Sequence, residues 1–135
     1  MKLKTFLLIC CFSLASNLFA ANLHKHPKAD DPASKPAEKK LMSPGYCEIE
    51  IINDSYDNVS VHGTFDDGTY VDFTVYRYEA PHYISLYYYG YCHPDMYLDI
   101  YTPYAKIYSG YTRVNSTVRI VPYLKNQAKA SISAR

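Results

Sequence analysis

The sequence lacks the short motifs that identify many enzymes. It contains no HExxH zinc motif, no GxSxG nucleophile motif and no glycine-rich phosphate loop. No spacing of its Ser and His residues predicts a nucleophile beside a general base. We therefore expect a protein that is not an enzyme and that carries no metal or other cofactor.

Basic residues are scarce between residues 46 and 124, where four Lys and Arg stand against ten Asp and Glu, for a net charge of −6. A region this acidic is a poor match for the phosphate backbone, so we do not expect nucleic-acid binding. The segments on either side are basic. This pattern allows a weak association of the two arms with anionic surfaces, although exposed Lys residues usually serve only solubility.

A long apolar run is also missing. Residues 1–20 combine a basic start at Lys2 and Lys4, a short apolar stretch and a small residue at Ala20, which is typical of a secretory signal peptide. The apolar stretch is shorter than the roughly 20 residues of a membrane span. The sequence therefore predicts a secreted or periplasmic protein without a stable membrane span after cleavage. Cleavage after Ala21 instead would place His24 third, as a Cu(II) or Ni(II) site at the new N-terminus requires.

Large apolar residues are few in residues 21–45, which carry four Pro and five Lys. Such a composition cannot bury enough surface to offset the entropy lost on ordering, so we expect a disordered linker. Residues 125–135 contain three positive charges and no acid. We expect them to form a basic tail, with a frayed helix as its only regular structure.

Only two cysteines would remain after signal cleavage, Cys47 and Cys92. An even pair in a small exported chain predicts a disulfide. No CxxC spacing is present to favour a metal site instead.

No segment between residues 46 and 124 shows a sustained helical period, whereas alternation with a period of two recurs along it. About seven strands are expected, around residues 47–51, 59–62, 70–76, 83–89, 96–101, 104–108 and 117–121. Asp67-Gly68 is a strong hairpin signal, and Ser109-Gly110 is interpreted as a further turn. The pattern predicts a small antiparallel β-sandwich of immunoglobulin-like shape, with a small closed barrel as the alternative. The absence of Trp leaves the family unassigned.

All 16 Tyr lie in this region. Where aliphatic residues point inward, many Tyr occupy the opposite positions and would form cross-strand rows. A Tyr ring offers apolar area with a hydroxyl at its tip, and Asp72 and Asp99 add acceptors among the rings. We expect a binding face for a glycan or a protein partner, formed by Tyr76, Tyr78, Tyr87, Tyr89, Tyr97 and Tyr101. The alternative is a structural or envelope-associated protein whose Tyr rows only stabilise the sheet.

Overall fold

The structure is a computed structural model that describes residues 22–28, 46–124 and 127–135. All regular secondary structure in those ranges is β-strand, so the described part of the chain is all-β, as predicted. The expected signal peptide, residues 1–20, lies outside the described residues, and so does the expected linker apart from residues 22–28.

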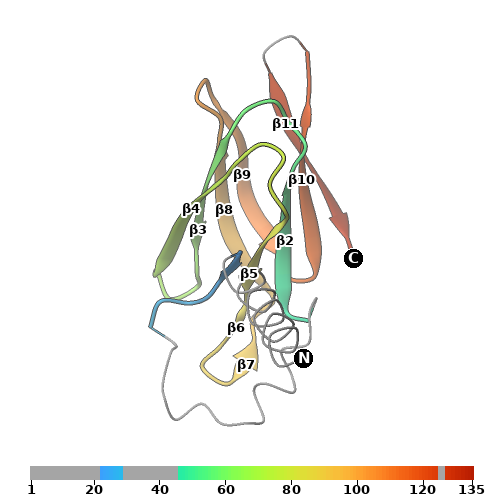
Figure 1. Cartoon of the computed structure of the whole chain (residues 1–135). Coiled ribbons are helices and arrows are strands. Elements are labelled where there is room, and N and C mark those ends of the chain that lie inside the picture. The colour runs from blue at the N-terminus through green and yellow to red at the C-terminus, as the bar shows by residue number, and fades with distance from the viewer. Residues whose placement is uncertain (1–21, 29–45, 125–126) are drawn as a thin grey trace, which may run out of the picture.

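A four-stranded sheet, antiparallel throughout, forms one layer of the molecule (Figure 1). Its strands lie in the order β4 (Tyr70–Val75), β3 (Val59–Thr64), β8 (Asp95–Tyr101) and β9 (Lys106–Arg113). A short turn around Gly68 joins β3 to β4, with φ of 84° at that glycine. A positive φ is inexpensive for glycine, which explains why the predicted Asp67-Gly68 hairpin forms.

A five-stranded sheet forms the second layer. Its order is β1 (Leu23–His24), β5 (His82–Ser85), β2 (Glu48–Asn53), β10 (Ser116–Pro122) and β11 (Ala128–Ala134). Two of its pairs, β1 with β5 and β2 with β10, are parallel. The prediction of an entirely antiparallel fold is therefore wrong for this sheet. Side chains alternate in the same way in both kinds of strand, so alternation alone does not reveal strand direction.

The segment expected as one strand over residues 83–89 is divided. After β5 the chain forms a separate hairpin of β6 (Tyr87–Tyr88) and β7 (Tyr91–Cys92). Its turn residues Tyr89 and Gly90 have φ of 52° and 85°. Positive φ at both central residues is the signature of the tight turn that suits the twist of a hairpin.

The described part of the expected basic tail, residues 127–135, forms a strand and not a frayed helix. Ala128–Ala134 form β11, paired antiparallel with β10 from Pro122↔Ala128 to Ser116↔Ala134. Lys129 lies over the Tyr123 ring, with its Nζ 4.9 Å from the ring centroid. Lys129 is thus attached to the domain. The alternation of Ala128, Ala130 and Ile132 was the signal in the sequence for this strand.

Both sheets contribute to one apolar core between them (Figure 1). The inward positions are those predicted by alternation, and they include Ile49, Ile51, Val59, Val61, Ile84, Met96, Leu98, Ile100, Val118 and Ile120. These side chains are 0–1% exposed. Their burial directs the alternate residues of each strand outward, and this sets the composition of the outer faces.

The predicted disulfide is confirmed. Cys47 and Cys92 are bonded, with Cα atoms 5.8 Å apart and a sequence separation of 45. The bond connects the residue before β2 to the last residue of β7, and it therefore ties the small hairpin to the five-stranded sheet.

Replacing both cysteines by serine is expected to lower the free energy of unfolding. A loop of 45 residues corresponds to about 4 kcal/mol in the loop-entropy model. Urea unfolding of Cys47→Ser/Cys92→Ser beside the oxidised chain measures the difference. A change below about 1 kcal/mol would contradict a stabilising role for the bond.

Candidate functional site

The outer face of the four-stranded sheet carries a row of polar residues across all four strands. Asp72 of β4 lies opposite His62 of β3, His62 lies opposite Asp99 of β8, and Asp99 lies opposite Ser109 of β9. Each residue alternates with an inward neighbour, so the row faces solvent. We call these four residues the polar row.

Tyrosines flank the polar row on both sides. On one side the cross-strand partners are Tyr70, Thr64, Tyr97 and Tyr111, and on the other side they are Thr74, Ser60, Tyr101 and Lys106. Tyr70 is 58% exposed, Tyr111 74% and Tyr101 38%. Aromatic rings accessible to solvent therefore border charged groups on the same sheet face.

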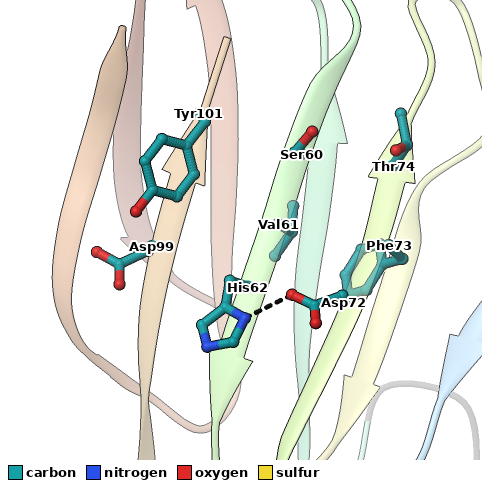
Figure 2. Close-up of a pocket in the computed structure, with 8 residues that line it drawn as sticks. All are labelled: Ser60, Val61, His62, Asp72, Phe73, Thr74, Asp99 and Tyr101. Atoms are coloured by element: carbon teal, nitrogen blue, oxygen red, sulfur yellow. Dashed lines mark hydrogen bonds and ion pairs between the residues drawn. The ribbon is translucent and has the colours of Figure 1, made fainter.

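His62 and Asp72 form the centre of this face (Figure 2). His62 Nδ1 lies 2.5 Å from Asp72 Oδ1, and its Nε2 lies 3.4 Å from the Thr64 hydroxyl. The His62 ring also packs against Tyr70, with the ring centroids 5.3 Å apart. These contacts orient the imidazole, and the carboxylate beside it can accept a second hydrogen bond from outside.

Asp99 is held by two donors from β9. It accepts a hydrogen bond from the Ser109 hydroxyl at 2.6 Å, and Lys106 Nζ lies 3.0 Å away. The Ser109 bond, followed by Lys106, lowers the pKa of Asp99 below its ordinary value. The Ser109 hydroxyl has one hydrogen, which it donates to Asp99. The Tyr97 hydroxyl, 2.8 Å from the Ser109 oxygen, therefore acts as the donor to Ser109. Tyr97, Ser109 and Asp99 thus form one chain of hydrogen bonds that keeps Asp99 ionised.

A hollow of about 650 Å³ lies on this face between His62 and Tyr101, bounded by Asp72 and Asp99 (Figure 2). Figure 2 shows Asp99 near the Tyr101 ring and Asp72 beside His62. The hollow thus combines a ring face, two acceptors and an imidazole. Such a set suits a ligand with hydroxyl groups on an apolar ring better than a purely apolar ligand.

Two of the six predicted binding tyrosines, Tyr97 and Tyr101, lie on this face. Tyr76 and Tyr78 follow β4 at the end of the sheet where Tyr101 lies, and they are 56% and 82% exposed. They add two exposed rings beyond the end of β4, but they have no cross-strand partners in the sheet.

Tyr87 and Tyr89 lie elsewhere, on the hairpin of β6 and β7 that projects below the two layers (Figure 1). The Tyr87 hydroxyl donates to the Gly90 carbonyl at 3.1 Å, and the Tyr89 hydroxyl donates to Asp67 at 3.2 Å. The structure therefore does not bring the six tyrosines together on one surface.

The sequence does not single out Tyr111, because Ser109-Gly110 predicts a turn just before it. Strand β9 instead continues through both residues to Arg113, and the chain reverses at Asn115, where φ is 58°. Asn is among the few non-glycine residues that readily adopt this conformation. The alternation of Ser109, Tyr111 and Arg113 was the available signal.

Within the described ranges, no group of three or more His, Cys, Asp and Glu side chains is arranged to hold a metal ion. Helices long and apolar enough to cross a membrane are likewise absent from these ranges. No protein-family model matches the chain, and the searches of curated proteins and of solved structures return no match either.

The hydrogen bond from Ser109 predicts a measurable change at Asp99. In Ser109→Ala the carboxylate loses the largest contribution to its lowered pKa, so the pKa of Asp99 is expected to rise toward its ordinary value. Titration of the Asp99 carboxyl carbon by NMR measures the change, and Ser60→Ala on the same face is the control. An unchanged titration in Ser109→Ala would contradict the assigned bond.

Proposed function

We propose that this chain is an exported, non-enzymatic binding module that holds a glycan on the outer face of its four-stranded sheet. The observation that carries the proposal is the hydrogen-bonded polar row with tyrosine rings on both sides. The rings can stack on the apolar face of a sugar, while Asp72 and Asp99 accept hydrogen bonds from its hydroxyls.

Charge and fold agree with this role. Asp99 stays ionised because of Ser109 and Lys106, so the face presents an acceptor prepared before a ligand arrives. A small β-sandwich of immunoglobulin-like shape is a common support for such a face, and two facing sheets with a shared core are consistent with it. The confirmed disulfide supports export into an oxidising compartment, either secretion or the periplasm.

A structural role in the cell envelope is the second candidate. It is favoured by Tyr97, whose ring packs edge-on against Tyr111 with centroids 5.1 Å apart and whose hydroxyl is already bonded to Ser109. Such cross-strand contacts stabilise a sheet without any ligand. In this role, removing the rings would lower stability and would also change self-association.

Alanine substitution at Tyr97 and Tyr101 separates the two candidates. If the rings bind a ligand, each loss is expected to weaken binding by about 2 kcal/mol, roughly thirtyfold in Kd, with little change in Tm. Binding is measured on a glycan array and, separately, on an array of surface proteins. Binding to surface proteins alone would replace the glycan by a protein partner.

The matched control is Tyr56→Ala, which removes a ring that is 71% exposed in the connection between β2 and β3, away from the polar row. Tyr89→Ala tests whether the hairpin takes part in binding. Unchanged binding in the double variant, or a collapse of its thermal transition, would overturn the proposal.

A further inference from the structure

Residues 22–28, which we call the strap, cover the edge of β5 that faces away from β2 (Figure 1). Leu23 and His24 pair in parallel with Tyr83 and Ile84, and the Tyr83 N–H donates to the Asn22 carbonyl at 2.8 Å. A pairing of two residues is short for a strand, so the attachment of the strap depends largely on its side chains. Those side chains include two histidines, His24 and His26.

His24 enters an aromatic stack. Its ring lies on Phe73 with centroids 3.6 Å apart and the planes 8° from parallel. Its Nε2 lies 2.8 Å from His82 Nδ1, and His82 Nε2 lies 3.0 Å from Glu79. Burial, followed by the neighbouring His82, lowers the pKa of His24 from 6.5 to about 4, while Glu79 acts in the opposite direction. His24 is therefore neutral while the strap is docked at neutral pH.

His26 is 1% exposed and is surrounded by the rings of Phe65, Tyr88 and Tyr89. The Lys28 N–H donates to His26 Nδ1 at 3.1 Å, and His26 Nε2 lies 2.8 Å from Asp67 Oδ2. The network assigns the proton of the neutral ring to Nε2, because Nδ1 serves as an acceptor. With a hydrogen on Nδ1, the ring could not accept the hydrogen bond from the Lys28 N–H, which holds the end of the strap.

Taken together, these contacts lead us to propose that the strap is an acid-released cover of the β5 edge. Its release exposes the Tyr83 N–H and the face of Phe73 and leaves the backbone of β5 unpaired on that side. This inference uses the side of β4 opposite the polar row and does not depend on the proposed glycan site.

The direction of the pH dependence follows from proton uptake. A released His24 binds a proton near pH 6.5, whereas a docked His24 does so only near pH 4. Docking therefore weakens as pH falls through this interval, by up to about tenfold per pH unit for one proton. Above pH 6.5 both states are neutral at His24, and docking no longer depends on its titration.

Of the charged groups around the two rings, Glu79 acts against this direction, but burial and His82 outweigh it at His24. Glu79 faces the His24 and His82 pair, and Asp67 faces His26. Hydrogen bonds from Thr69 hold the pKa of Asp67 well below its ordinary range, so this carboxylate does not titrate within the interval. The test is directed at His24, whose ring stacks on Phe73 and whose pKa burial lowers.

NMR of the labelled full chain between pH 7.5 and 4 tests the inference. The Leu23 methyls and the Tyr83 amide report on the strap, and the methyls of Ile49 and Val118 report on the core. We expect the strap signals to move to unstructured positions as pH falls below 6.5, while the core signals keep their folded positions.

His24→Phe keeps a ring on Phe73 but cannot take up a proton, so its strap is expected to remain docked at least tenfold more strongly than the wild-type strap at pH 5. His62→Gln is the matched control, because His62 lies on the outer face and should leave the wild-type profile unchanged. Three results would each overturn the inference: a strap docked down to pH 4, joint loss of strap and core signals, or a wild-type profile in His24→Phe.

Discussion

The register of β3 between β4 and β8 is the constraint on which both faces of the four-stranded sheet depend. Val61 lies opposite Phe73 and Ile100, while the next residue, His62, lies opposite Asp72 and Asp99. A shift by one residue would send the polar side chains into the core and the aliphatic ones into water. Burial of Val59 and Val61 therefore helps to fix the polar row in place.

Gly63 fits this register because it has no side chain. It occupies an inward position on β3, and a Cβ atom there would lie 2.6 Å from Met96 Cε and 3.2 Å from Leu98 Cδ2. The space of one side chain is instead filled by Met96 and Leu98 from the neighbouring strand. A larger residue would require the Met96 side chain to move and the Leu98 side chain to give way slightly, at the inward positions that flank Tyr97.

Alternation of side chains was sufficient to predict the all-β fold, the core positions and the outward direction of Tyr97 and Tyr101. Pairings distant in sequence could not be read from it. The parallel contact of β2 with β10 depends on how the chain crosses between layers, which no local pattern records. The small residues of β11 gave too weak an apolar signal, and the strap appeared too polar to dock.

The histidines explain why the strap is ordered although its composition predicts a disordered linker. A His in a Pro- and Lys-rich stretch is expected to face solvent, yet His26 is buried because an aromatic pocket and Asp67 satisfy both its apolar and its polar atoms. His93 is buried in the same way, stacked on Tyr88 with centroids 3.6 Å apart and bonded to Asp66. Such partners come from distant segments, so only the folded chain reveals them.

Strand β4 connects the two regions for which we propose a role. Phe73 stacks against His24 of the strap on one side of β4. The adjacent Asp72, which belongs to the polar row, and Thr74 lie on the other side. Among the described strands, β4 lies at the edge of its sheet, next to β3. Loss of the strap would remove the ring stacked on Phe73 and loosen the strand that positions Asp72. If both proposals hold, acid would therefore weaken the glycan site through β4, even though Asp99 stays ionised on β8.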